Sequence, residues 1–392
     1  MRIYLDYNST TPCAPEVVNK MLPFFSNEFG NAASLHEAGR EALTAIDDAR
    51  DQIARALSTS PEKVYFTGSA TESNNISLLG LINSNKQRRK IAVSSIEHKS
   101  ILEPAKQLEN NGYTIVFLPV DRNGMINLNA AKELIDEQTL LVSVQGANNE
   151  TGVIQPIREI VKLAHACGTI FHCDAVQMFG KIPFDIEELR IDLASFSAHK
   201  IYGPKGIGAL FIANGKIAKI IKPIFYGGKQ EKGLRPGTQN VPAIVGFGCA
   251  SQIIGNSLKS EMNHIRTLRE KMENKLIKNI PEIVVNGQNA SRVPGTISLT
   301  ISGIPSDMLI ANLTNVCVSN GSACNSGALE PSHVLLAMKL RQEEAENTIR
   351  ISIGRYTTEI DIENAYHEIL HAVNKLRSKT FHNKKLNSML GG

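Results

Sequence analysis

Residues 197–206 read SAHKIYGPKG, a lysine followed by a turn-forming segment. A short apolar stretch, Asp192 to Ser197, precedes the lysine and predicts a strand. Two glycines and a proline then bend the chain sharply after Lys200. A lysine held at such a place can form a Schiff base with a carbonyl group. Most of the 42 Lys and Arg residues are expected to be solvated, so Lys200 indicates chemistry only together with other residues.

A second candidate segment is residues 172–177, HCDAVQ. It follows the apolar Ile170 and Phe171, which predicts that Asp174 lies at the carboxyl end of a strand, where open α/β sheets bind ligands. A carboxylate there can keep a pyridine nitrogen protonated, as pyridoxal 5'-phosphate (PLP) needs to act as an electron sink, and Gln177 could reach the ring's 3-oxygen. The alternative is an aspartate that only caps the next turn.

A third segment, residues 67–75, TGSATESNN, leads into the apolar run Ile76 to Leu81. A helix that begins here offers backbone N–H groups and a hydroxyl to a phosphate, although ordinary helix capping is equally compatible with it. The Gly227-Gly228-Lys229 triplet lacks the spacing and the Ser/Thr of a Walker A loop, and no GxGxxG follows a strand. Nucleotide-binding motifs are therefore excluded.

The hydrophobic pattern alternates helices with short buried strands and predicts a mainly parallel α/β sheet covered by helices. Expected strands are 91–95, 114–118, 140–144, 195–197 and 208–212, and the expected first long helix is 38–57. After Gly255 the pattern changes to a long helical stripe that Pro281 ends, then strands at 295–301 and 349–353 and a last helix over 362–373. We expect a large domain at 15–255 and a smaller α+β domain formed by 1–14 and 256–392.

Together these residues resemble the cysteine desulfurases of the NifS/IscS type, which are class V PLP enzymes of fold type I. The resemblance extends from residues 4–12, YLDYNSTTP, to residues 350–357, RISIGRYT. Its most specific part is 318–332, VSNGSACNSGALEPS, which is similar to the nucleophile loop of the branch with a long loop. The resemblance implies a seven-stranded, mainly parallel sheet and PLP as the cofactor.

The resemblance also assigns roles to individual residues. Lys200 would hold PLP and remove the substrate's Cα proton, and Asp174 would contact the ring nitrogen. His98 matches the histidine that stacks on the ring and assists proton transfer, although a histidine at a strand end is more often structural. The other matches to cofactor contacts are Ala70, Thr71, Asn149, Gln177, Ser197, His199 and, from the second subunit of a homodimer, Thr238.

On the substrate side, Arg350 matches the arginine that binds the carboxylate of L-cysteine, with Asn149 beside it. Cys324 as a thiolate would attack the substrate's sulfur, release alanine and keep a persulfide. Small residues surround Cys324, which predicts an exposed nucleophile that can hand sulfur to an acceptor protein.

The other five cysteines lie beside apolar residues and are expected to be small buried hydrophobic residues. No pair has CxxC spacing, so no metal site is expected. Without a signal peptide, six cysteines in 392 residues predict a reducing, cytoplasmic location.

Charge and hydropathy argue against a nucleic-acid-binding protein, a membrane protein and a secreted protein. The net charge of +4 predicts no strong direct nucleic-acid binding, and the basic stretch 375–385 is interpreted as a solvated helix end. The longest apolar run, Val241 to Gly255, is too short to span a membrane, and residues 1–6 lack the apolar core of a signal peptide.

The sequence leaves the sulfur's destination open. The stretch after Leu376 lacks the longer tail that helps family members of general iron–sulfur assembly to dock their scaffold. Nitrogenase maturation, tRNA thiolation and DNA phosphorothioation are therefore as plausible as general iron–sulfur cluster assembly. Two rival functions also remain: another PLP enzyme of this fold, such as an aminotransferase or selenocysteine lyase, and a catalytically idle scaffold of a sulfur-transfer complex.

Overall fold

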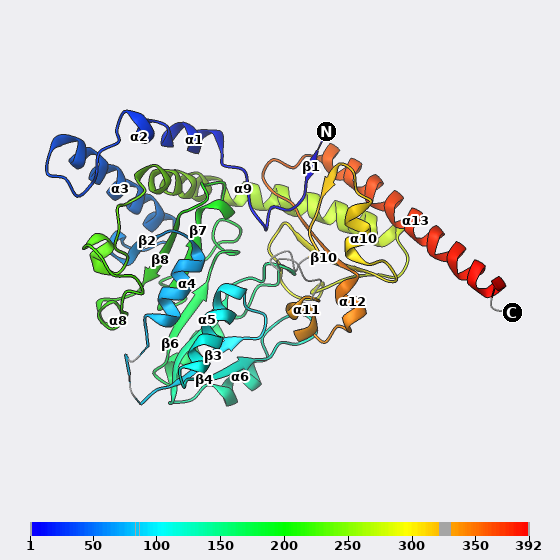
Figure 1. The fold of residues 1–392 in the computed structure, drawn as a ribbon, viewed down its shortest axis with the longest axis horizontal. Helices are drawn as coiled ribbons and strands as arrows, with labels where there is room; N and C mark the ends of the chain where they lie inside the picture. Colours follow the sequence, from blue (N-terminus) through cyan, green and yellow to red (C-terminus); the bar gives the residue numbers. More distant parts are fainter. Residues whose placement is uncertain (1, 83, 86, 321–330, 391–392) are drawn as a thin grey trace.

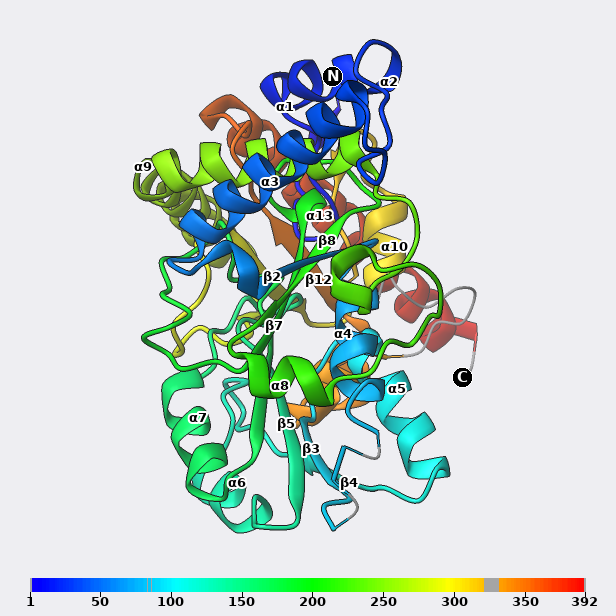
Figure 2. The same cartoon turned by 90° about the vertical axis from the view of Figure 1, so that its left-hand side faces the viewer.

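The computed structural model describes residues 2–82, 84–85, 87–320 and 331–390. Its larger part is a seven-stranded sheet with helices on both faces (Figure 1 and Figure 2). Across the sheet the strands follow the order β2 (Val64–Thr67), β8 (Gly208–Ile212), β7 (Leu193–Ser197), β6 (Ile170–Asp174), β5 (Thr139–Gln145), β3 (Lys90–Ser94) and β4 (Thr114–Leu118). Only β8 runs against its two neighbours in this sheet, which confirms the predicted mainly parallel α/β sheet.

Side chains of one strand alternate between the two faces of the sheet. In β5, Leu141 packs into the core below one set of helices and Val142 into the core below the other. The helices that share a core with Leu141 are α4 (Ala70–Leu79), α5 (Lys99–Asn110) and α8 (Gly215–Ile220). Those that share a core with Val142 are α3 (Glu37–Ala56), α6 (Leu128–Leu134), α7 (Ile157–Ala166) and α9 (Val241–Asn279). Burial on both faces explains the continuous apolar runs of these strands.

Helix α9 differs from the prediction, because it runs unbroken from Val241 to Asn279 across the domain border expected at Gly255. Gly255 faces open space, so it costs the helix only its intrinsic propensity, about 1 kcal/mol relative to alanine. By length and composition α9 could cross a membrane, but 56% of its most apolar window is buried inside the protein. We therefore assign α9 to the core, where it packs along α3.

A second, smaller core lies at the other end of α9. It contains the antiparallel sheet β12 (Thr348–Ser352), β10 (Thr296–Ile301) and β9 (Ile283–Val285), and the parallel pair β1 (Ile3–Tyr4) and β11 (Val316–Cys317). Helices α10 (Ser306–Ala311) and α13 (Glu359–Leu390) cover it, and α13 extends away from the body (Figure 1). The N-terminal strand and the C-terminal third thus share one core, and the division into domains at 15–255 and at 1–14 with 256–392 remains our proposal.

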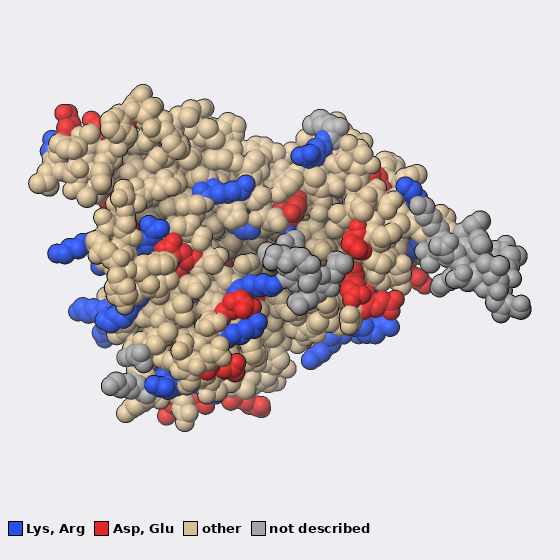
Figure 3. Space-filling view, in the orientation of Figure 1, with Lys and Arg blue, Asp and Glu red and all other residues tan. Residues whose placement is uncertain are grey.

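The remaining elements are short. They are α1 (Pro15–Met21), α2 (Pro23–Ser26), α11 (His333–Ala337), α12 (Gln342–Glu346) and three 3-10 turns, η1 (Pro61–Lys63), η2 (Ala198–Lys200) and η3 (Gln230–Gly233). On the face in Figure 3, basic and acidic side chains are mixed and form no continuous basic patch.

Candidate active site

A cavity of about 300 Å³ lies between the carboxyl ends of β6 and β7, the start of α4 and the small sheet. Its volume is at the lower end of the range for small-molecule sites. Ten of the predicted site residues line it: Ala70, Thr71, His98, Asn149, Asp174, Gln177, Ser197, His199, Lys200 and Arg350. Segments from 70 to 350 in the sequence therefore meet at one place.

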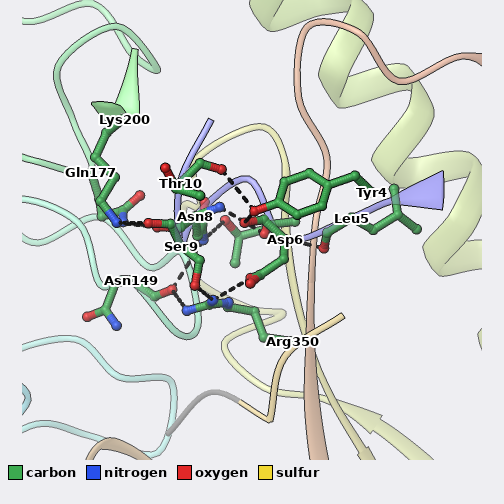
Figure 4. A network of polar contacts seen from close by, with 12 residues as sticks. Tyr4, Leu5, Asp6, Asn8, Ser9, Thr10, Asn149, Gln177, Lys200 and Arg350 are labelled. Carbon is green, nitrogen blue, oxygen red and sulfur yellow. Dashed lines mark hydrogen bonds and ion pairs between the residues drawn. The ribbon is translucent and has the colours of Figure 1, made fainter. Parts of the chain in front are cut away.

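Lys200 ends the 3-10 turn that follows β7. Its Nζ donates to the backbone carbonyls of Asn8 and Ser9, each at 2.6 Å, which aims the amine into the cavity (Figure 4). Both of these acceptors are backbone carbonyls of the N-terminal segment. The N-terminal segment thus fixes the direction of the lysine.

Asp174 is the last residue of β6 and is only 6% exposed. One carboxylate oxygen accepts from Asn74 Nδ2 at 2.8 Å and the other from the Val176 backbone N–H at 3.1 Å. These two hydrogen bonds fix the direction of both carboxylate oxygens. The cavity therefore has a fixed, preorganised acceptor at its base.

Helix α4 begins at the edge of the cavity with Ala70, and Thr71 follows it. The N-cap Ser69 uses its Oγ to accept the Glu72 N–H at 3.1 Å, and Ser69, Ala70 and Thr71 at the helix start line the cavity. A Cβ at Gly208 would lie 2.6 Å from the Ser69 carbonyl carbon, so glycine lets β8 approach this turn closely. Such a helix start suits an anionic group.

His98 caps the start of α5 and reaches the same cavity. Its Nδ1 accepts the Ser100 N–H at 3.1 Å, which places the ring proton on Nε2 in the neutral form. Burial lowers the pKa of His98 below its usual value; the charge of Lys200 acts in the same direction and that of Asp174 opposes it. Burial therefore favours the neutral imidazole of His98.

Lys181 is a second amine beside the cavity that the sequence analysis did not single out. Its Nζ donates to Asn8 Oδ1 at 2.8 Å and to Gln177 Oε1. The amide NH2 of Gln177 donates to the Asn8 carbonyl at 3.1 Å, so the Gln177 Oε1 is the atom that faces Lys181. Burial, reinforced by Lys200 and Arg350, lowers the pKa of Lys181 well below its usual value.

Arg350 lies in the middle of β12, and its side chain is only 5% exposed. Its Nη2 donates to Asp6 Oδ1 at 2.6 Å and to Ser9 Oγ at 3.3 Å, and its Nη1 donates to the Asn149 carbonyl at 3.0 Å (Figure 4). Its buried Nε has no hydrogen-bond partner among the described residues. The predicted substrate arginine is thus held from two sides at the cavity.

Two predicted site residues are not part of this cavity. Thr238 is exposed and does not line it. Cys324 lies outside the described residues. Of the other five cysteines, Cys173 is buried as predicted, whereas Cys13, Cys167, Cys249 and Cys317 are only partly buried. Cys13, Cys167 and Cys249 nevertheless pack against the larger hydrophobic core.

The N-terminal side of the site was not predicted from the sequence. Asn8 and Ser9 line the cavity and orient Lys200, and Asp6 pairs with Arg350. The segment 4–12 was recognised as part of a family resemblance but received no role. Its polar residues beside an apolar strand were the available signal. Within the part of the chain that the structure describes, no group of three His, Cys, Asp or Glu side chains could hold a metal ion.

Comparison with known proteins agrees with this geometry. The family model described as aminotransferase class-V matches residues 3–365. The protein named cysteine desulfurase IscS from Rickettsia typhi is 44% identical over 378 residues, which cover 96% of this chain and 92% of the relative. A solved structure titled NifS-like protein superposes with a TM-score of 0.89 at 37% identity, covering 95% of this chain and all of the other. Another, titled SspA in complex with cysteine, has a TM-score of 0.79 at 34% identity and covers 91% of this chain and all of the other.

Proposed function

The chain belongs to the class V aminotransferases and, among them, to the cysteine desulfurases of the IscS/NifS type, and we propose that it uses PLP in the cavity around Lys200 to take sulfur from L-cysteine. The observation that carries this proposal is the convergence of Lys200, Asp174, His98 and Arg350 on one cavity. An amine, a buried carboxylate, a neutral imidazole and a guanidinium together suit an amino-acid substrate bound to a pyridine aldehyde.

The residues fit PLP by their chemistry. Lys200 presents an amine for the aldehyde, the buried Asp174 presents an acceptor for the ring nitrogen, and the start of α4 presents N–H groups for the phosphate. Ala70, Thr71, Ser197 and His199 line the cavity and would complete the phosphate contacts, while Asn149 and Gln177 would lie beside the ring oxygen. When bound, PLP would supply an electron sink that stabilises negative charge at the substrate's Cα.

Two groups of the chain would assist proton transfer. Lys200 Nζ, held by two carbonyls, would take the Cα proton of the substrate. His98 Nδ1 accepts the Ser100 N–H, so neutral His98 would donate a hydrogen bond from Nε2. Arg350 lines the cavity and would orient the substrate through its carboxylate.

Cys324 would accept the sulfur. Its thiolate would attack the sulfur of cysteine, the substrate's Cβ–S bond would break, and an S–S bond would form on Cys324. The former substrate carbon would gain a proton and leave as alanine, so cysteine and the enzyme thiol would become alanine and an enzyme persulfide without an outside oxidant or reductant.

The substitution Cys324→Ser tests this assignment. We expect the variant to keep its cofactor absorbance and to bind cysteine, but to release neither alanine nor sulfide in the presence of a thiol reductant. Turnover close to that of the wild type would favour an aminotransferase or another PLP activity of the same fold. A colourless wild-type protein that binds no PLP would instead favour a scaffold role.

We also propose that the working unit is a homodimer, in which Thr238 contacts the cofactor of the other subunit. Thr238 is exposed and lies outside its own cavity. Large apolar side chains are exposed between α1 and α3, namely Leu22, Phe25, Phe29 and Leu35, the last of them 92% exposed. Exposed apolar surface of this kind suits a protein interface.

The sulfur acceptor is a separate question. We propose a cytoplasmic acceptor protein, because the five described cysteines are free thiols, as expected in a reducing compartment. Iron–sulfur cluster assembly, tRNA thiolation and DNA phosphorothioation all remain candidate destinations. Transfer of radiolabelled sulfur from the Cys324 persulfide to neighbouring proteins identifies the acceptor.

A further inference from the structure

Asp6 is fixed in place by backbone pairing on both of its sides. The Leu5 N–H donates to the Cys317 carbonyl at 2.9 Å, so the segment continues the pairing of β1 with β11. On the other side, the Ser352 N–H donates to the Leu5 carbonyl at 2.7 Å, and Asp6 forms a parallel bridge with Ser352. The Asp6 carboxylate is thus held beside β12 by regular hydrogen bonds and does not depend on a mobile loop.

The Asp6 carboxylate meets Arg350 where both are largely removed from water. The side chains are 19% and 5% exposed, and Oδ1 lies 2.6 Å from Nη2. Nη1 is occupied by the Asn149 carbonyl at 3.0 Å. Two different acceptors on two different nitrogens fix both the position and the rotation of the planar guanidinium (Figure 4).

The place of Arg350 gives this pair a role beyond bracing. Arg350 lines the cavity, so a ligand carboxylate that enters the cavity can meet the guanidinium. Rotation of a planar guanidinium changes which of its N–H groups a ligand can accept from. The acceptors on Nη1 and Nη2 therefore fix which donors of Arg350 the ligand meets.

We propose that Asp6 is a positioning residue that holds Arg350 in the orientation in which it binds the substrate carboxylate. This inference rests on the proposed function of Arg350 as the carboxylate site. Asp6 itself does not touch the substrate in this proposal; it acts through the guanidinium. The competing interpretation is that the pair only braces the N-terminal segment against β12.

The test compares two ligands that differ by the carboxylate alone, L-cysteine and cysteamine. Binding to the PLP-loaded enzyme is followed by the change in cofactor absorbance in a Cys324→Ser background, where turnover does not interfere. We expect Asp6→Ala to weaken cysteine binding about tenfold and to leave cysteamine binding unchanged, because only cysteine uses Arg350. Asp6→Asn keeps an oxygen acceptor for Nη2 and should restore most of the affinity.

A double-mutant cycle shows whether Asp6 acts through Arg350. If it does, Asp6→Ala should have no further effect on cysteine binding once Arg350→Ala is present. If Arg350→Ala alone leaves the preference for cysteine over cysteamine unchanged, the proposed role of Arg350 fails. If Arg350→Ala removes that preference but Asp6→Ala does not change it, only the role of Asp6 fails.

Glu273 and Arg292 supply a matched control, because they form another largely buried ion pair, at 2.9 Å, whose residues do not line the cavity. Glu273→Gln should lower the melting temperature and leave the preference for cysteine intact. If Asp6→Ala behaves in the same way, or binds cysteine more tightly than the parent, Asp6 is a brace or a competitor for Arg350 and the proposal is overturned.

Discussion

The two walls of the cavity are built in different ways. On one wall, Lys200 and Asp174 stand at the ends of the neighbouring strands β7 and β6 of a single sheet. On the other wall, Arg350 is held by Asp6, which is 344 positions away in the sequence, and by the Asn149 carbonyl, 201 positions away. The first wall forms when the large sheet forms, whereas the second wall requires that both ends of the chain have folded together. Cofactor binding and substrate binding should therefore respond separately to mutation.

The largest expected effect is at the first wall. Lys200→Ala should abolish covalent PLP and all alanine formation, because it removes the amine that we propose to hold the cofactor and to take the Cα proton. Lys181→Ala is the matched control, since it removes the neighbouring amine, which bonds Asn8 and Gln177. It should keep covalent PLP. Absorbance and borohydride trapping measure covalent PLP in both variants. Alanine release by Lys200→Ala would refute the assignment.

The next effect separates the two walls. Arg350→Ala should raise the apparent KM for cysteine by a factor equivalent to about 2–5 kcal/mol, since it removes one partner of a desolvated charge pair. The PLP content should change little, because Arg350 contacts neither Lys200 nor Asp174 in the described hydrogen bonds. Steady-state kinetics and cofactor content measure the two quantities. If Arg350→Ala also lowers the PLP content to a similar extent, cofactor binding and substrate binding are not independent.

A pH effect is expected at the second wall. Burial raises the pKa of Glu150, which follows Asn149, from 4.5 to about 7, although the Ser332 hydroxyl and Arg350 oppose this shift. Because the pKa of Glu150 is higher in the folded state, this group stabilises the fold. Its contribution to the free energy of unfolding is fully present below pH 4.5 and is lost as the pH rises through 7. The loss is at most about 3 kcal/mol. Denaturant unfolding at several pH values should show that the free energy of unfolding falls with pH in the wild type more than in Glu150→Gln. The same pH dependence in both proteins would contradict this prediction.

The smallest effect concerns a contribution from a second subunit to the first wall. Thr238→Ala should weaken PLP retention modestly, because one phosphate contact is lost. Mixing the inactive Lys200→Ala chain with an inactive variant of the Thr238 region should restore part of the activity, since one complete site forms in each heterodimer. A stable, fully active monomer at low concentration would contradict the proposed dimer.

The sequence predicted the first wall well because its signals are local. An apolar strand followed by Asp174, and another followed by Lys200, place both side chains at one edge of a parallel sheet. The second wall has no such signal. Hydrophobic periodicity does not reveal that Asp6 pairs with Arg350 or that the carbonyls of Asn8 and Ser9 orient Lys200, because these contacts depend on long-range packing. The continuous helix α9 was not predicted for a related reason, since its first half packs in the larger core and its second half in the smaller one.

The most direct test of the proposed function is the mass of the peptide that contains Cys324 after incubation with L-cysteine alone. We expect the PLP-loaded enzyme to form alanine and to gain one sulfur atom on this peptide, in equal amounts in the first turnover. Cys324→Ser and Lys200→Ala should show neither product. Alanine formation with no sulfur on Cys324, or sulfur on another cysteine in its place, would contradict the proposed sulfur transfer.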